Sequence, residues 1–188
     1  MIRPNEWQSF PWLNGRGTTS QIIIEPAEAN FSDLDFDWRL SSAPIFESGN
    51  FSRFPDHHRM LTLIEGKGLE LQKPDSSIRK LKIGDFFEFS GEEDIFASPV
   101  QGPIRDLNFI YKKDFLKPSY SWEPSIPNLK SRQFSSENHH LIYLISGKLN
   151  HTTGTVAEAG DTICISPTTD SKYLNWKSEA ASFIRISF

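Results

Sequence analysis

Two arginines in the first half of the sequence have the chemistry needed to hold a carboxylate. Arg39 lies in the run WRLSSAPI, and Arg59 comes directly before the apolar run Met60–Ile64. A guanidinium group is planar and always charged, and its N–H donors form a fork that matches the two oxygens of a carboxylate. Arg39 and Arg59 are therefore candidates for binding a small anion. The alternatives are a structural ion pair for Arg39 and a solvated side chain for Arg59.

Several polar residues stand two positions apart, so on a strand they would point to the same face. Arg39 and Ser41 would share one face of their strand, and Asp106 and Asn108 would share one face of the predicted strand 105–111. If these faces line an interior, Arg39 is a buried cation that needs an anionic partner. Asp106 is the candidate partner, and Ser41 and Asn108 are candidate hydrogen-bonding groups for a ligand. A structural Arg–Asp pair without a ligand is the alternative.

A glycine-rich segment near the N-terminus offers further ligand contacts. Asn14–Thr18 combines two glycines with a side-chain amide, a hydroxyl and the cation Arg16. Glycine allows a ligand to approach the backbone closely, so its N–H groups can face an anion. Asn14 and Thr18 are candidate ligand-binding residues. The alternative is a plain turn between Trp12 and the next strand.

The segment Phe51–Pro55 supplies two more candidates. Ser52 could donate a hydroxyl hydrogen bond to a bound carboxylate or amide, and Phe54 could form an apolar wall of a pocket. The alternative is a turn that carries two core aromatic side chains, Phe51 and Phe54.

The histidines do not have the spacing of a metal site. They are His57, His58, His139, His140 and His151. Adjacent side chains on a strand point to opposite faces, so neither adjacent pair can easily face one ion. We expect no metal, no other cofactor and no catalytic residue, because no Ser, His and acid stand at a recognised spacing either. The histidines are expected to cap or flank strands at the surface.

Composition excludes several classes of partner. The 188 residues carry a formal net charge of −4, which argues against a nucleic-acid partner. No apolar run reaches the ~18 residues needed to span a bilayer, and no leader is recognisable, so we expect a cytoplasmic protein with no membrane partner. The single cysteine, Cys164, lies in an apolar run and is expected to be a small core residue. The high aromatic content leaves a homodimer possible.

Short apolar runs bounded by turn residues predict an all-β fold. Few windows hold apolar residues at helical spacing, and 12 prolines and 11 glycines interrupt the chain at short intervals. The expected strands are Gln21–Glu25, Phe36–Leu40, Met60–Ile64, Phe86–Phe89, Leu107–Tyr111, Leu141–Ile145, Thr162–Ile165 and Ser182–Phe188.

An internal repeat divides these strands into two similar halves. A strand ending in Gly66-Lys67 leads to the turn Gly84-Asp85, and the same order recurs at Gly147-Lys148 and Gly160-Asp161. Glycine at these points permits the positive φ of tight turns. Residues 1–116 are therefore expected to form an N-terminal barrel that holds the ligand pocket. Residues 117–188 would form a linker, rich in Pro and Ser over Lys117–Pro127, and a C-terminal barrel, all within one compact unit.

This repeat resembles the cupin superfamily, in which a strand ending in a Gly turn and a later Gly-Asp turn frame a small β-barrel. Two copies imply a bicupin, that is, two jelly-roll-like β-barrels packed together. Metal-dependent cupins carry a His-x-His pair followed by Glu, and this chain lacks that pattern.

The first half is similar to the HutD/Ves family of bicupins in four ordered motifs. The family patterns are W-x-N-G-G-G-x-T, W-R-x-S-x-A, F-S-x-F-P-G-x-D-R and D-x-N. The corresponding segments here are Trp12–Thr19, Trp38–Ala43, Phe51–Arg59 and Asp106–Asn108. The chain departs from the family at Arg16, which replaces a glycine, and at Asp56-His57-His58, which replaces Gly-x-Asp.

The resemblance implies a regulator of bacterial histidine utilisation that binds a small acidic metabolite and has no established catalytic activity. The expected ligand is a small anion such as a formylated or imidazole carboxylate, bound in the first barrel without turnover. The main alternative is a cupin-type enzyme, metal-dependent or metal-free, that acts on a small carboxylate. A further alternative is an interaction module whose polar interior is only a satisfied hydrogen-bond network.

Overall fold

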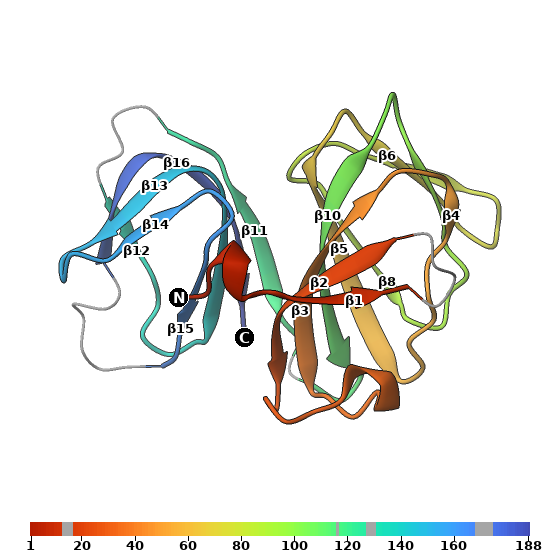
Figure 1. Cartoon of the computed structure of the whole chain (residues 1–188), viewed down its shortest axis with the longest axis horizontal. Helices are drawn as coiled ribbons and strands as arrows, with labels where there is room; N and C mark the ends of the chain where they lie inside the picture. The colour runs from red at the N-terminus through yellow and green to blue at the C-terminus, as the bar shows by residue number, and fades with distance from the viewer. Residues whose placement is uncertain (13–16, 116, 127–130, 168–174) are drawn as a thin grey trace. The chain divides into compact units, whose positions relative to one another are not determined.

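The computed structural model describes residues 1–12, 17–115, 117–126, 131–167 and 175–188. The described chain consists of strands, turns and two short 3-10 helices, η1 (Pro4–Glu6) and η2 (Phe31–Asp33) (Figure 1). The predicted all-β fold is confirmed. In these ranges no helix is long and apolar enough to cross a membrane.

The chain divides into two compact units. The N-terminal unit is Trp7–Phe115, and the C-terminal unit combines Met1–Glu6 with Leu116–Phe188. The internal repeat predicted that all of residues 1–116 form the first barrel. The first six residues instead belong to the C-terminal unit, where Ile2 and Thr162 exchange backbone hydrogen bonds of 2.8 and 2.9 Å. This pairing is too distant in sequence to leave a local signal.

Two antiparallel sheets build the N-terminal unit. The six strands of the larger sheet are, in order, β1 (Gln8–Pro11), β2 (Thr18–Glu25), β3 (Trp38–Ile45), β10 (Ile104–Lys112), β5 (His57–Glu65) and β8 (Phe86–Ser90). The smaller sheet has the order β4 (Gly49–Asn50), β9 (Phe96–Pro99), β6 (Leu69–Gln72) and β7 (Ile78–Leu81). Five of these strands, β2, β3, β5, β8 and β10, occur where short apolar runs predicted them, with bounds that differ by a few residues. The other five, β1, β4, β6, β7 and β9, were not predicted.

The core of this unit lies between the two sheets. Its buried members come from both sheets and are Ile45, Leu61, Leu63, Leu69, Leu71, Leu81, Phe89, Ile95, Ala97 and Ile104. A full Leu or Phe side chain removed from water contributes about 1.5–3 kcal/mol, so this cluster holds the sheets together. A second, smaller apolar cluster contains Ile24, Phe36, Phe54 and Ile110.

The C-terminal unit is a single sheet with its own core. Its strands are β11 (Ser119–Glu123), β16 (Asn175–Ser187), β13 (His140–His151) and β14 (Val156–Glu158) in order, with β12 (Ser131–Gln133) paired to β16 and β15 (Thr162–Ile165) paired to β13. The core includes Ile142, Leu144, Leu149 and Phe183. The stretch expected to be a linker therefore contributes a strand, β11, which pairs with β16 along its whole length.

The repeated glycines adopt the backbone conformation that the repeat predicted. Gly66, Gly84, Gly147 and Gly160 have φ values of 106°, 85°, 73° and 92°. The second copy differs from the prediction, because β13 does not end at Gly147 but continues to His151 through irregular register. The prediction that Cys164 is a core residue is wrong, because it lies on the exposed side of β15.

Candidate functional site

The pairing register of three adjacent strands brings Arg39 and Arg59 together. Arg39 on β3 and Arg59 on β5 are both directly opposite Ile110 on β10, which lies between them. Residues directly opposite each other in antiparallel strands point to the same face of the sheet. Both guanidinium groups therefore project into the interior of the N-terminal unit, and Arg39 is 2% and Arg59 4% exposed.

The polar side chains form a layer between the two apolar clusters of this unit. Along β10, alternation places Ile104, Asp106, Asn108 and Ile110 on one face. Ile104 belongs to the larger cluster and Ile110 to the smaller one, so Asp106 and Asn108 lie between them. Ser41 on β3 is opposite Asn108 and is also buried.

Arg59 is well supported by its surroundings. Its Nη1 donates to the backbone oxygen of Ser52 at 2.9 Å, and its Nε donates to Oδ1 of Asn108 at 3.3 Å. Its Cζ lies 4.9, 5.1 and 5.0 Å from the ring centres of Phe51, Phe54 and Phe89, respectively. Burial lowers the pKa of Arg59 to about 10, against which the charge of Asp106 acts.

Arg39 is less completely satisfied. Its Nε donates to Oε1 of Gln21 at 2.8 Å, and its Cζ lies 4.1 Å from the ring centre of Phe31. Its Nη2 is buried and has no hydrogen-bond partner among the described residues. Burial, and to a smaller extent the charge of Arg59, lower the pKa of Arg39 to about 10. The two buried cations therefore repel each other electrostatically.

Asp106 is the carboxylate that balances part of this charge. Its Oδ1 accepts from the backbone N–H of Ala43 at 3.0 Å, and its Oδ2 accepts from Nδ2 of Asn108 at 3.4 Å. Burial raises its pKa to about 6, although the hydrogen bond from Ala43 and the charge of Arg59 favour the ionised form. The direct Arg39–Asp106 ion pair considered from the sequence does not occur among the described contacts, in which Arg39 bonds to Gln21 instead.

The candidate ligand-binding residues predicted in the two loop segments differ in burial. Phe54 is buried beside Arg59, as an apolar wall would be, whereas Ser52 uses its backbone oxygen and leaves its side chain exposed. Thr18 is exposed at the start of β2, and Asn14 lies outside the described residues.

Four side chains that contact the arginines were not predicted from the sequence. Gln21 and Phe31 contact Arg39, and Phe51 and Phe89 contact Arg59. For Phe51 a signal was available, because it lies in the same sequence motif as Arg59. Phe89 comes next to Arg59 only through the register of β8 against β5, which the sequence does not show.

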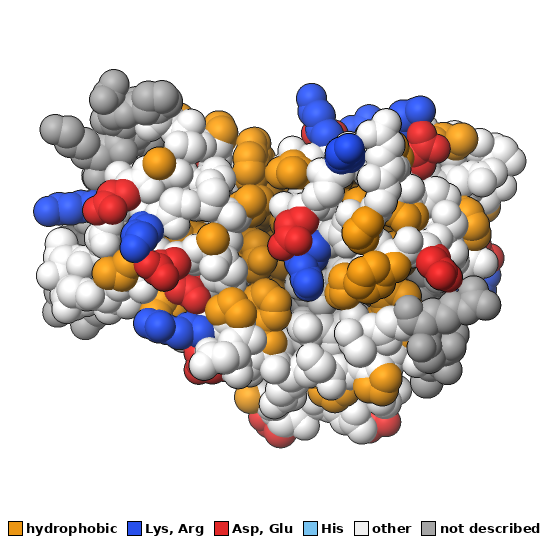
Figure 2. All heavy atoms as spheres, turned by 45° about the horizontal axis from the view of Figure 1, so that its top comes forward, with side chains coloured by type: hydrophobic (Ala, Val, Ile, Leu, Met, Phe, Trp, Pro, Cys, Tyr) orange, Lys and Arg blue, Asp and Glu red, His pale blue; other side chains and the backbone are white. Residues whose placement is uncertain are grey.

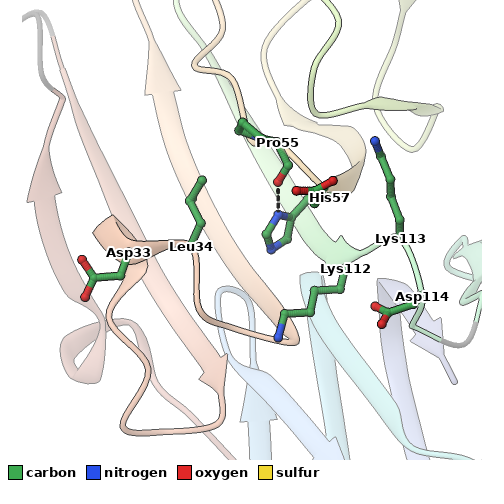
Figure 3. A pocket seen from close by; sticks show the side chains of 8 residues that line it. Asp33, Leu34, Pro55, His57, Lys112, Lys113 and Asp114 are labelled. Carbon is green, nitrogen blue, oxygen red and sulfur yellow. Dashed lines mark hydrogen bonds between the residues drawn. The ribbon is translucent and has the colours of Figure 1, made fainter.

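A separate cavity of about 550 Å³ opens near one end of β5, and Figure 3 shows it. His57 lies at its centre and is buried, with Nδ1 2.6 Å from the backbone oxygen of Pro55 and its ring 4.7 Å from that of Phe36. Its lysines are engaged in ion pairs, Lys112 with Asp37 at 3.0 Å and Lys113 with Glu92 at 2.9 Å. Among the described residues, no charged side chain lining this cavity has a buried polar atom without a hydrogen-bond partner, as Nη2 of Arg39 does.

The expectation that the histidines lie at the surface is wrong for three of them. His57, His140 and His151 are buried, and each ring forms hydrogen bonds to neighbouring groups, so they act as packing residues. Within the described ranges, no three His, Cys, Asp or Glu side chains are grouped so that they could hold a metal ion.

A family model described as HutD matches residues 5–183. The chain belongs to the HutD family. An uncharacterised 21.2 kDa protein in the hutC 3′ region of Pseudomonas putida is 35% identical over 147 residues, covering 78% of this chain and 73% of that protein. Protein Ves of Escherichia fergusonii is 40% identical over 100 residues, covering 53% of this chain and 50% of that protein.

Solved structures agree with this assignment. HutD from Pseudomonas fluorescens SBW25, in a formate condition, is 26% identical with a TM-score of 0.79 and covers 99% of this chain and 96% of that one. A bacterial pirin from Escherichia coli in complex with nickel(II) is 11% identical with a TM-score of 0.62, covers 100% of this chain and 97% of that one, and shares the fold alone. The HutD/Ves resemblance and the cupin-like fold predicted from the sequence are both confirmed.

Proposed function

We propose that this HutD-family protein binds a small organic anion between Arg39 and Arg59 and does not chemically transform it. The observation that carries the proposal is the imbalance of buried charge. Two guanidinium groups share one interior face with a single carboxylate, Asp106, and Nη2 of Arg39 has no hydrogen-bond partner among the described residues. An unpaired buried donor costs free energy, and a bound anion would recover it.

The chemistry of the site favours a carboxylate as the anion. Arg39 would offer its free Nη2, and Ser41 and Asn108 lie on the same face as hydrogen-bonding groups. A planar carboxylate matches the fork of a guanidinium, and a formylated or imidazole carboxylate carries this group on a small body. The formate condition of the Pseudomonas fluorescens HutD structure makes formate the natural first probe.

A role in regulating histidine utilisation is the biological part of the proposal. It is supported by the names of the relatives, HutD itself and a protein of the hutC 3′ region. The predicted absence of turnover is part of the same proposal. A protein that binds without turnover can report on a metabolite because binding stabilises one of its conformations by mass action.

Thermal unfolding with and without ligand tests the binding. Formate, an N-formyl amino acid or an imidazole carboxylate at about 100 times its Kd should raise the melting temperature by about 5–10 °C. Arg59→Gln should abolish this rise. The matched control is Arg53→Gln, since Arg53 lies in the same segment but pairs with Asp94 at the surface.

Two results would contradict the proposal. One is a melting temperature that none of these anions changes. The other is a rise that survives in Arg59→Gln as fully as in Arg53→Gln, because the anion would then bind elsewhere.

A further inference from the structure

A second cavity of the N-terminal unit borders the arginine site. Its volume is about 390 Å³, and it lies between the end of β3, strand β4 and strand β9. Four aromatic side chains, Trp12, Phe46, Phe51 and Phe96, line it together with Ile45 and Ala97. Phe46 is 63% and Phe96 39% exposed, which is unusual for Phe. Figure 2 shows hydrophobic side chains reaching the surface of this unit on the face turned to the viewer.

Phe51 is common to this aromatic cavity and to the arginine site. Phe51 lines the cavity, and its ring lies 4.9 Å from Cζ of Arg59. Phe51 is only partly buried and follows the two-residue strand β4, so its side chain is held by a loop. Phe51 therefore connects the aromatic cavity to the guanidinium group of Arg59.

Trp12, another lining residue of the aromatic cavity, is held in place by hydrogen bonds. Nε1 of Trp12 donates to Oγ1 of Thr19 at 2.9 Å, and the backbone N–H of Trp12 donates to the oxygen of Gly17 at 2.9 Å. A Cβ added to Gly17 would lie 2.9 Å from the Trp12 ring, so only glycine lets the ring lie against the backbone there. A wall that is fixed before binding loses little conformational freedom when a ligand arrives.

Charge restricts what the aromatic cavity can accept. Glu47 is its charged lining residue, and it forms no ion pair with any described residue. A second negative charge on a ligand would be repelled there, whereas an uncharged flat body would bury apolar area against the rings.

We infer that the aromatic cavity holds the apolar body of the ligand whose carboxylate binds at the arginines. The ligand class is then a monocarboxylate with a flat, unsaturated body, and the ring of Phe51 turns aside to let the carboxylate reach Arg59. This inference rests on the proposed function, because it extends the anion site by an apolar subsite.

Isothermal titration of three probes tests the subsite. Formate has no body, benzoate adds a flat ring, and terephthalate adds a second carboxylate to that ring. Benzoate should bind at least about tenfold more tightly than formate, because burying the ring face contributes the difference. Terephthalate should bind more weakly than benzoate, and Glu47→Gln should reduce that gap.

Two surface variants assign the effect to the aromatic cavity. Phe96→Ala should bring benzoate affinity close to that of formate and leave formate affinity unchanged. Ile78→Ala is the matched control, because Ile78 is a 57% exposed side chain on β7, at the other edge of the same sheet. It should change neither affinity.

The possible failures are distinguishable. Formate binding that depends on Arg59, with benzoate no tighter or insensitive to Phe96→Ala, overturns the apolar subsite and leaves the anion site intact. Absence of binding by formate and benzoate alike overturns the proposed function and the subsite with it.

Discussion

Replacing Arg39 with Met separates the two reasons for which a buried arginine can be present. A structural arginine holds the fold together, and its loss destabilises the protein. An arginine kept for a ligand carries an energetic cost until the ligand arrives. Met has a long, flexible side chain that fills a similar space without charge, so Arg39→Met removes the cation and leaves little empty volume.

The contacts of Arg39 allow an estimate of the change. Its pKa falls from 12.5 to about 10, which corresponds to about 3 kcal/mol against the charged form in the folded protein. Arg39→Met recovers this free energy. It also leaves Oε1 of Gln21 without its donor, at a cost of about 1–3 kcal/mol, and loses the contact with Phe31, worth about 0.5–2 kcal/mol. These terms nearly cancel, so the free energy of unfolding should change by no more than about 2 kcal/mol.

Urea denaturation in a buffer free of carboxylates and phosphate measures this change, and its repetition with formate measures the response to ligand. The ligand-free stability of Arg39→Met should stay close to that of the wild type, while the stabilisation by formate disappears. Arg59→Met is the comparison and should be the less stable variant, because Arg59 has two hydrogen bonds and three ring contacts to lose. A loss of about 3–5 kcal/mol in ligand-free Arg39→Met, with the formate response preserved, would refute the reasoning.

Two further predictions concern single positions, and a third concerns metal. Burial raises the pKa of Asp106 from 3.8 to about 6, so its stabilising contribution is fully present well below pH 3.8 and is lost as pH rises through 6. The difference in unfolding free energy between the wild type and Asp106→Asn should therefore fall by about 2 kcal/mol from pH 4 to pH 7. Gly66 and Gly102 have similar φ values, 106° and 112°, but an added Cβ would lie 2.5 Å from Ile104 at Gly66 and meet nothing within 4 Å at Gly102. Gly66→Ala should therefore lower the melting temperature clearly more than Gly102→Ala, which carries only the backbone strain of about 1–3 kcal/mol. Dialysis against a chelator should leave the melting temperature of the purified protein unchanged, and a fall reversed by a divalent metal would contradict this.

The sequence was sufficient to group the central polar residues because strand alternation is local. Arg39 with Ser41, and Asp106 with Asn108, share faces by their spacing alone. That Arg59 joins them depends on the order β3-β10-β5, in which strands far apart in sequence become neighbours. Alternation predicts which residues share a face of one strand, and only the register shows which strands share a site.

Gln21 shows why part of the site could not be predicted. Regular alternation places Gln21 and Ile24 on opposite faces of β2, since three positions separate them. The structure has an irregular register between Gln21 and Ile23, so that Gln21 lies opposite Ser41 and Ile24 lies opposite Arg39. An extra residue in one strand reverses the facing of everything beyond it. The bulge therefore turns Gln21 toward Arg39 while Ile24 stays in the apolar cluster.

In the proposed anion site, Arg39 and Arg59 would have different roles. Arg59 is held by Asn108, the backbone of Ser52 and the rings of Phe54 and Phe89, so its position is fixed before a ligand arrives. Arg39 keeps a buried donor free of any described partner and thus retains bonding capacity for an anion. A fixed side chain loses little conformational entropy when a ligand binds, and an unsatisfied buried donor gains a hydrogen bond. In the ligand-free protein, Arg39 is the arginine with the unsatisfied buried donor. Substitutions of Arg39 should therefore alter the response to ligand more than the stability of the fold, and substitutions of Arg59 should alter both.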